Sequence, residues 1–238
     1  MKKKRLRHKT TVAIIPSAGK GKRFGGKKNY LSLNGTPVLA RTIETLEDCP
    51  LIEAIVLVVR REDIEYVKNS IVKKFNLKKV IAVVKGGKER QDSVAAGLLA
   101  AGRGFDFVLV HDGARPLVTR EILERAIKAA YRHGASVAAM PPKDTIKEIR
   151  GRFIKKTIPR DTLVSVQTPQ VFKYDILKRA CEMAAKDGFR STDEAALVER
   201  LGVKIIFTPG SYENIKITTK EDLATAELIL KTRQGLSP

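Results

Sequence analysis

The chain has 238 residues, of which 43% are hydrophobic, and this is enough to close one sizeable core. Its 46 lysines and arginines outnumber its 26 aspartates and glutamates, so the formal net charge is +20 and anionic partners are expected. The two cysteines, Cys49 and Cys181, lie outside any CxxC pattern and no apolar run is long enough to span a bilayer, which argues against a disulfide framework, a zinc site and a membrane span and favours a cytoplasmic protein.

The first nine residues, MKKKRLRHK, carry six positive charges without any apolar period. They predict a disordered basic tail at residues 1–9, followed by a single domain at residues 10–238. A solvated tail is favoured over a nucleic-acid-binding arm. The short apolar run that follows ends at Pro16 and is too short for a signal peptide.

Strands and helices are expected to alternate over the first half of the chain. The β-branched runs lie at residues 11–15, 54–59, 80–84 and 107–111, and helical-period segments lie between them at residues 36–48, 61–75 and 89–101. This alternation predicts an α/β fold, Rossmann-like, with a mostly parallel sheet and helices on both faces. The continuous apolar character of residues 54–59 is typical of a strand buried on both sides.

A helix at residues 119–133 and a strand at residues 135–140 are expected next. The insert at about residues 141–164 alternates without a helical period, which predicts a β-arm that protrudes from the sheet.

Near the carboxyl end, Ser191 and Glu194 have the spacing of a capping box at a helix start. Strands are expected at residues 203–210 and 213–218. A last helix is expected from Thr219, with acidic residues in its first turn.

Ligands of open parallel sheets bind beyond the carboxyl ends of the strands, and a glycine- and lysine-rich loop follows the first strand. The loop fails the dinucleotide pattern because Phe24 replaces the third glycine, and it fails the Walker pattern because Lys28 replaces the hydroxyl residue. It retains Gly19 and Gly21, whose backbone N–H groups can approach phosphate oxygens, together with Arg23 and Lys28 as cations. The alternative is an ordinary solvated turn.

Two further polar segments follow strands. In KGGKERQDSVAAGL, Gly86, Arg90 and Ser93 either contact a nucleotide or form a tight strand-to-helix turn. In VLVHDGARP, Asp112 directly follows a buried strand and is placed to hold Mg²⁺ on a triphosphate, with a turn role as the alternative. Arg115 either orients Asp112 or is structural.

Seven segments occur in the order expected of one known family: AGKGKRF with KKNYLSLNGTPVLARTI, GGKERQDSVAAGL, VHDGARP, PKDTIKE, PRDTLVSVQTPQVF, STDEA and ENIKIT. Over nearly the whole chain after the tail, they resemble the 2-C-methyl-D-erythritol 4-phosphate cytidylyltransferases. The resemblance implies transfer of a cytidylyl group from CTP to this polyol phosphate, which gives 4-diphosphocytidyl-2-C-methyl-D-erythritol and pyrophosphate in non-mevalonate isoprenoid synthesis. It also implies Mg²⁺ or another divalent cation as cofactor.

The resemblance also implies roles for individual residues. Arg23 and Lys28 would be catalytic, and Asp112 would hold the metal. The residues implied in nucleotide binding are Ala18, Gly19, Gly21, Gly86, Arg90, Ser93, Asp112 and Lys216. Those implied around the acceptor are Thr145, Arg160, Thr168 and Thr192. The arm would make a homodimer by arm exchange, in which Thr145 and Arg160 act on the partner subunit's substrate.

The chain departs from the family at two places. It reads KKNY where the family commonly has Pro-Lys-Gln-Tyr, so Lys27 and Lys28 are both candidates for the catalytic lysine. Gly113 stands where the family usually has alanine, a change expected to loosen the backbone beside Asp112 without abolishing binding. The acceptor phosphate is itself a nucleophile, so His111 is expected to be a packing residue.

Two alternatives remain at this stage. Ribitol-5-phosphate cytidylyltransferase shares the fold and the CTP motifs, and the sequence does not separate the two acceptors. A nucleic-acid-binding module is suggested by the charge of +20, but aromatic residues make up only 5% of the chain and tryptophan is absent, so stacking platforms are scarce and this reading is not favoured.

Overall fold

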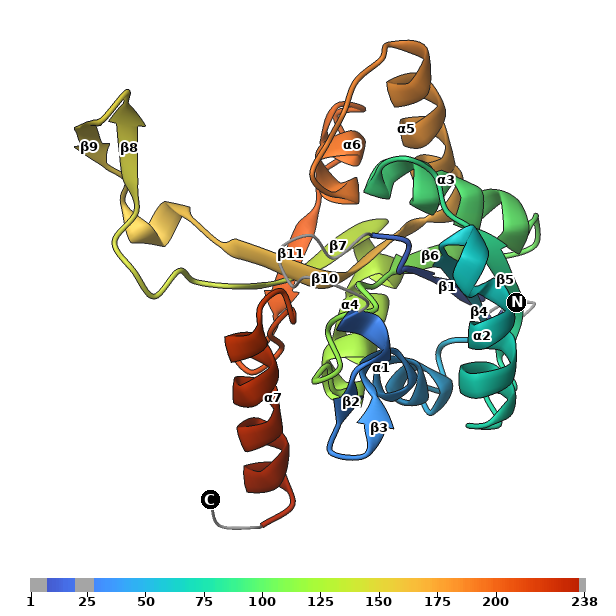
Figure 1. The fold of residues 1–238 in the computed structure, drawn as a ribbon. Coiled ribbons are helices and arrows are strands. Elements are labelled where there is room, and N and C mark those ends of the chain that lie inside the picture. Colours follow the sequence, from blue (N-terminus) through green and yellow to red (C-terminus); the bar gives the residue numbers. More distant parts are fainter. Residues whose placement is uncertain (1–7, 20–27, 236–238) are drawn as a thin grey trace, which may run out of the picture.

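The computed structural model describes residues 8–19 and 28–235, and within them seven strands form one sheet in the order β11-β7-β10-β6-β1-β4-β5 (Figure 1). The strands are β1 (Thr11–Pro16), β4 (Ala54–Val59), β5 (Val80–Lys85), β6 (Phe107–Val110), β7 (Ala135–Met140), β10 (Ser165–Lys173) and β11 (Ile206–Pro209). Only β10 runs antiparallel to its neighbours, β6 and β7. The predicted mostly parallel α/β sheet is confirmed.

Seven α-helices accompany this sheet in the described part of the chain. They are α1 (Val38–Glu47), α2 (Ile64–Tyr66), α3 (Arg90–Ala101), α4 (Arg120–His133), α5 (Tyr174–Lys186), α6 (Glu194–Glu199) and α7 (Lys220–Arg233). Short 3₁₀ turns occur at η1 (Lys28–Tyr30), η2 (Arg61–Asp63) and η4 (Arg160–Thr162), and α2 continues as a π-helix, η3 (Val67–Lys73).

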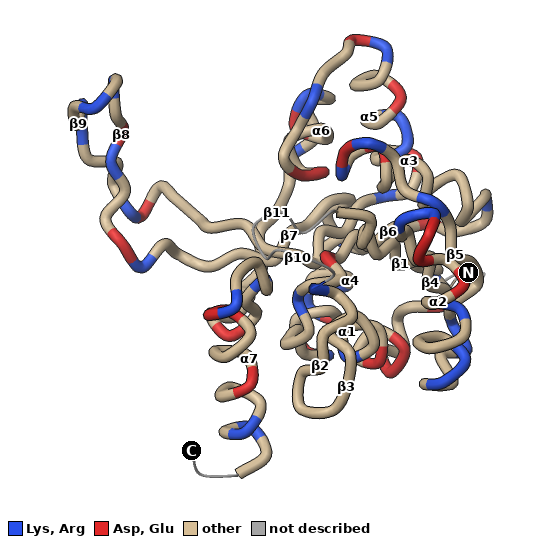
Figure 2. Tube along the Cα trace, viewed as in Figure 1, with Lys and Arg blue, Asp and Glu red and all other residues tan. Residues whose placement is uncertain are grey.

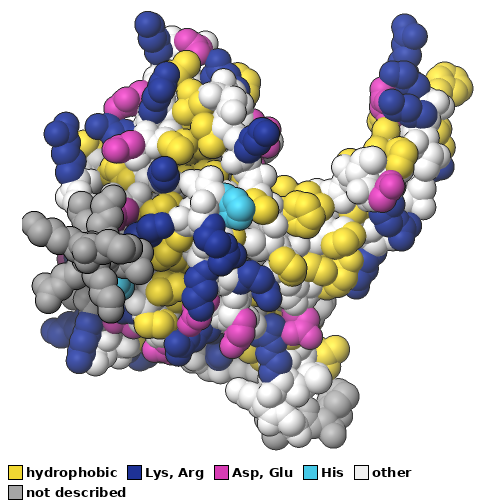
Figure 3. Space-filling model, turned by 180° about the vertical axis from the view of Figure 1, so that it is seen from behind, with side chains coloured by type: hydrophobic (Ala, Val, Ile, Leu, Met, Phe, Trp, Pro, Cys, Tyr) yellow, Lys and Arg dark blue, Asp and Glu magenta, His cyan; other side chains and the backbone are white. Residues whose placement is uncertain are grey.

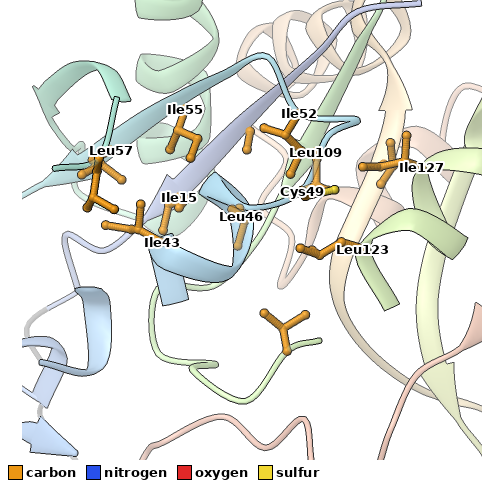
Figure 4. Close-up of a cluster of buried hydrophobic side chains, with 14 of the residues drawn as sticks. Ile15, Ile43, Leu46, Cys49, Ile52, Ile55, Leu57, Leu109, Leu123 and Ile127 are labelled. Atoms are coloured by element: carbon orange, nitrogen blue, oxygen red, sulfur yellow. The ribbon is translucent and has the colours of Figure 1, made fainter. Parts of the chain in front are cut away.

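The core lies on both faces of the sheet because alternate strand residues point to opposite sides. Ala13 and Ile15 of β1 join a cluster with α1 and α4, which Figure 4 shows from Ile15 across to Ile127. Val12 and Ile14 join a second cluster with α3 and α5. Full burial of each large aliphatic side chain contributes about 1.5–3 kcal/mol, so this two-sided packing is what holds the strand ends in place.

A small hairpin of β2 (Ser32–Leu33) and β3 (Thr36–Pro37) was not predicted. Asn34 and Gly35 form its turn with φ angles of 50° and 80°, the left-handed values that a two-residue I′ turn requires. The Asn-Gly pair was therefore a usable signal. The hairpin buries Leu33 in a third cluster against α7.

Two predictions about the carboxyl-terminal part are wrong. Asp193, not Ser191, caps α6, because its Oδ1 accepts a hydrogen bond of 3.1 Å from the N–H of Ala196, while Glu194 turns into the protein. Residues 213–218 form no strand of the described sheets, although the N–H of Ile217 donates to the carbonyl of Ala114 at 2.8 Å. Within this segment Asn214 and Ile217 are fully buried.

Two further helices differ in how well the sequence indicated them. The helix predicted from Thr219 is confirmed, with Thr219 and Asp222 in a reciprocal capping box. Helix α5 was missed, although Tyr174, Leu177 and Cys181 are buried at helical spacing.

The predicted arm leaves the sheet between β7 and β10 and ends in a hairpin of β8 (Lys147–Arg150) and β9 (Phe153–Thr157) (Figure 1). Apolar and basic side chains both occur on its surface (Figure 3). Ile149, Phe153 and Ile154 are 65%, 81% and 67% exposed, so this chain by itself leaves them uncovered.

Residues 1–7 of the predicted basic tail lie outside the described part. Lys9 contacts the body of the protein, since its Nζ donates to the carbonyl of Tyr131 at 2.6 Å and lies over the rings of Phe107 and Tyr131. Within the described residues, no helix combines the length and the apolar character needed to cross a membrane.

Candidate active site

A cavity of about 780 Å³ opens beyond the carboxyl ends of β1, β4, β5 and β6. Seven of its described lining residues are cationic: Lys28, Arg60, Arg61, Lys85, Lys88, Arg90 and Lys216. Three are acidic: Glu62, Glu89 and Asp112. This excess of cations suits a polyanionic ligand.

Most of the predicted nucleotide-binding residues meet in this cavity. Those that line it are Ala18, Gly19, Lys28, Gly86, Arg90, Ser93, Asp112 and Lys216. Gly21 and Arg23, as well as Lys27, lie outside the described residues, so their predicted roles stay predictions.

Asp112 is the centre of the cavity's charge network. Its Oδ1 lies 3.1 Å from Nη2 of Arg90, and its Oδ2 lies 2.9 Å from Nζ of Lys216 and 3.5 Å from Nε of Arg115. Its backbone N–H donates to Oγ1 of Thr168 at 3.1 Å. Burial alone would favour the protonated carboxyl, but the three cations outweigh it and hold the pKa of Asp112 well below its usual range.

Glu194 completes this network and was missed as a functional residue. It is 1% exposed, and both of its carboxylate oxygens accept hydrogen bonds from Nη1 of Arg90, at 2.6 and 2.7 Å. Burial raises the pKa of Glu194, and Arg90 opposes that shift. Arg90 therefore bridges two carboxyl groups, one on α6 and one after β6.

The loop after β1 and the turn after β5 approach each other at Gly86. A Cβ on this residue would collide with the Cβ of Ala18 and lie 2.7 Å from Oγ of Ser93. Ser93 accepts a hydrogen bond from the N–H of Gly87 at 3.2 Å and donates to the carbonyl of Glu89 at 3.1 Å. Glycine is thus required here by space, and Ser93 holds the shape of the turn.

Lys28 lies at the other end of the glycine loop. It begins the turn η1, and its Nζ donates to the carbonyl of Ile217 at 2.6 Å, beside Lys216. Asn29 donates from Nδ2 to the carbonyl of Ser17 at 3.2 Å, which ties the end of the loop back to β1.

The predicted acceptor-binding residues do not gather in one place. Thr168 is buried against Asp112. Thr192 is exposed and lines a separate hollow of about 410 Å³ with Arg90 and Arg190. Thr145 and Arg160 lie on the exposed arm and do not line the cavity of their own chain.

Arg60, Arg61 and Glu62 also line the cavity and were not predicted. They directly follow β4, so the same rule that located the other loops could have found them. Arg60 is held by Asp63, whose Oδ2 lies 2.8 Å from its Nε.

His111 directly follows β6 and is buried, with Nε2 donating to the carbonyl of Arg115 at 3.3 Å. Burial lowers the pKa of His111 from 6.5 to about 4, so between these pH values the unfolded chain binds a proton that the folded protein does not. Stability should therefore fall as the pH drops, by about 2 kcal/mol from this group at pH 5. Urea unfolding at pH 7.5 and pH 5 should show this loss in the wild type and not in His111→Gln.

His133 provides the matched control because it is exposed on the last turn of α4. His133→Gln should keep the pH dependence of the wild type. An equal loss of stability in wild type and His111→Gln would show that His111 is not the source.

Gly113, beside Asp112, is tightly packed. A Cβ there would collide with Oγ of Ser17 and lie 2.9 Å from Cδ1 of Leu39, so space explains this glycine better than the loosened backbone expected from the sequence. We expect Gly113→Ala to lower the free energy of unfolding by about 1–3 kcal/mol. Ser17→Ala/Gly113→Ala should recover most of it, because the colliding oxygen is removed.

Ser17→Ala alone should be nearly neutral in the same denaturation measurement, since its buried Oγ has no hydrogen-bond partner among the described residues. A double variant no more stable than Gly113→Ala would show that Ser17 is not the obstacle.

An open, mostly parallel sheet with a cationic cavity beyond its strand ends is the architecture of a nucleotide-binding α/β protein. The sequence profile of the 2-C-methyl-D-erythritol 4-phosphate cytidylyltransferases matches residues 11–232. The chain belongs to this family, and it is a nucleotidyltransferase.

Relatives agree in sequence and in structure. The chain is 44% identical over 227 residues to the 2-C-methyl-D-erythritol 4-phosphate cytidylyltransferase of Syntrophus aciditrophicus, covering 94% of this chain and 97% of that protein. It is 46% identical over 227 residues to that of Alkaliphilus oremlandii, covering 94% and 96%. The crystal structure of 4-diphosphocytidyl-2C-methyl-D-erythritol synthase from Anaerococcus prevotii superposes with a TM-score of 0.84 at 32% identity, covering 94% of this chain and 99% of that chain.

Proposed function

We propose that the cavity around Asp112 is where this cytidylyltransferase joins CTP to 2-C-methyl-D-erythritol 4-phosphate and releases pyrophosphate, in isoprenoid synthesis. The observation that carries the proposal is the meeting of Arg90, Lys216 and Lys28 with Asp112 beyond the strand ends, in a chain of this family. The product is 4-diphosphocytidyl-2-C-methyl-D-erythritol.

The chemistry requires charge neutralisation more than a nucleophile from the protein. The acceptor's phosphate oxygen attacks the α-phosphorus of CTP, the bond to the β-phosphate oxygen breaks, and pyrophosphate leaves. Two anions must approach, so oriented cations dominate the catalytic need. Lys28, and Arg23 in the loop outside the described residues, would stabilise the charge at the α-phosphate. His111 is buried and hydrogen-bonded, which supports its role in packing.

The donor set fits Mg²⁺ or another divalent cation held largely by the substrate. Among the described residues, no group of three His, Cys, Asp or Glu side chains could ligate a metal. Asp112 would therefore be its protein ligand, with phosphate oxygens and water completing the octahedral shell that Mg²⁺ requires. When bound, the ion would neutralise charge on the triphosphate. Lys216 lies 2.9 Å from Oδ2 of the same carboxylate. When the ion binds, Lys216 would either give up its contact with this oxygen or share the oxygen with the ion.

The arm supports a homodimer. Thr145 and Arg160 lie on an exposed projection outside their own chain's cavity, and Ile149, Phe153 and Ile154 are uncovered. An exchanged arm would bury these apolar side chains and bring both polar residues to the partner subunit's acceptor. Arg160→Ala and Lys28→Ala, each inactive alone, should regain about a quarter of wild-type activity when mixed, because half of the dimers would then hold one intact site.

The experiment that tests the proposal is pyrophosphate release from CTP with Mg²⁺, comparing 2-C-methyl-D-erythritol 4-phosphate with ribitol 5-phosphate. Turnover with the first acceptor is expected. Turnover with ribitol 5-phosphate alone would identify the protein as a ribitol-5-phosphate cytidylyltransferase. Turnover with neither acceptor would refute both activities. Strong salt-dependent retention on DNA would favour a nucleic-acid module, although Figure 2 shows Lys and Arg spread over the arm and several helices.

A further inference from the structure

Both ends of the arm are hydrogen-bonded to one short segment that precedes α7. We define the brace as residues 211–216, between β11 and α7. The hydroxyl of Tyr212 donates to the carbonyl of Pro141, directly after β7, at 2.9 Å. On the returning strand β10, Nε2 of Gln167 donates to the carbonyl of Ser211 at 2.8 Å. Both roots of the arm are therefore attached to the brace.

The middle of the brace is the buried residue Asn214, which is 0% exposed. Its Nδ2 donates to the carbonyl of Thr168 at 2.9 Å and to Oε1 of Gln167 at 3.1 Å. Its own carbonyl accepts a hydrogen bond of 2.6 Å from Nη1 of Arg115. Two of these hydrogen bonds come from the buried side-chain amide and the third goes to the backbone carbonyl, and together they hold the neighbouring residues in one arrangement.

The far end of the brace reaches the nucleotide site. Lys216 lies 2.9 Å from Oδ2 of Asp112. Thr168 and Arg115, both bonded to Asn214, contact the same residue, at the backbone N–H and at the carboxylate. Three of the contacts to Asp112 therefore come either from the brace itself or from residues that are hydrogen-bonded to it.

The arrangement in space matches these bonds. Figure 1 shows the arm leaving the sheet where β7, β10 and β11 lie together, next to the start of α7. A displacement of the arm's root must either break its hydrogen bonds to the brace or move the brace. If the brace moves, Lys216, which is part of it, moves as well.

We propose that the brace couples the anchoring of the arm to the charge pairing of Asp112, with Tyr212 and Asn214 as positioning residues that act through Lys216. The arm's position thereby sets the affinity of the cavity for CTP. The inference deepens the proposed function and rests on it, since it concerns the same nucleotide site.

Tyr212→Phe is the sharpest variant, because it keeps the ring under Lys143, whose Nζ lies 4.2 Å from the ring centroid, and removes only the bond to Pro141. Tyr212 is 44% exposed, so folding should be preserved. Isothermal titration of CTP with Mg²⁺ should show a Kd raised about two- to tenfold, the usual effect of one lost hydrogen bond. Tyr66→Phe, at a tyrosine 43% exposed on α2, is the matched control and should bind as the wild type does.

A double-variant comparison separates coupling from a general structural effect. In a Lys216→Gln background, Tyr212→Phe should weaken CTP binding less than it does in the wild type, because the contact of Lys216 with Asp112 is already lost. Asn214→Ala should weaken CTP binding more than Tyr212→Phe does. If Asn214→Ala does not fold, the CTP affinity of Tyr212→Phe still tests the inference. Unchanged affinity in Tyr212→Phe, or equal losses in both backgrounds, would overturn the inference. A wild type that binds no CTP would instead refute the proposed function.

Discussion

Arg90→Met should lower the free energy of unfolding by about 3–5 kcal/mol, because it leaves the buried Glu194 carboxyl without its partner. Arg90 binds both oxygens of Glu194 at 2.6 and 2.7 Å while it contacts Asp112 at 3.1 Å. Arg90→Lys should also lower the free energy of unfolding, because an ammonium is a point charge and cannot contact Glu194 and Asp112 as the guanidinium group does. Chemical denaturation at neutral pH gives the comparison.

The double variant Arg90→Met/Glu194→Gln separates stability from function. It should recover much of the stability, because no unpaired buried carboxyl remains and Asp112 keeps Lys216 and Arg115. CTP binding should stay weak in the single and the double variant. Full recovery of CTP affinity in the double variant would mean that Arg90 serves only the fold.

Lys28→Ala should reduce kcat about 10²- to 10³-fold, the usual effect of removing one preorganised group from a developing charge. The KM for CTP should change much less if the cation acts mainly in the transition state. Lys28 lies at the cavity wall, with its Nζ 2.6 Å from the carbonyl of Ile217. Steady-state kinetics, in which one substrate is varied while the other is saturating, measures kcat and the KM for CTP.

Two controls sharpen this result. Lys231→Ala removes a cation from the exposed face of α7 and should leave kcat unchanged. Lys27→Ala tests the alternative that the neighbouring lysine is catalytic. A collapse of kcat in Lys27→Ala, with Lys28→Ala close to wild type, would transfer the role to Lys27.

Local signals predicted well wherever burial follows directly from chain periodicity. The strands at residues 54–59 and 107–110 lie where continuous apolar runs placed them, since buried parallel strands need no polar face. Helix α7 begins where Thr219 and its acidic neighbours indicated. These features depend on residues adjacent in the chain, so the sequence carries them explicitly.

The capping of α6 shows where such rules fail. Ser191 and Asp193 both suit a helix start, and spacing alone favoured Ser191 with Glu194. Arg90, which lies 104 positions away along the chain, draws Glu194 into the interior, and Asp193 becomes the cap. A distant ion pair thus outweighed a local motif.

By itself, the sequence determined the alternation of strands and helices, the glycine-rich loop after β1, Asp112 after β6 and the resemblance that named the family. Only the tertiary structure decided which charges meet: Arg90 lies between Asp112 and Glu194, and Lys216 of the brace pairs with Asp112. The physical reason is that apolar periodicity is a property of residues that are neighbours in the chain, so it can be recognised in the sequence. Burial of a charge is settled by partners that the chain brings together only when it folds.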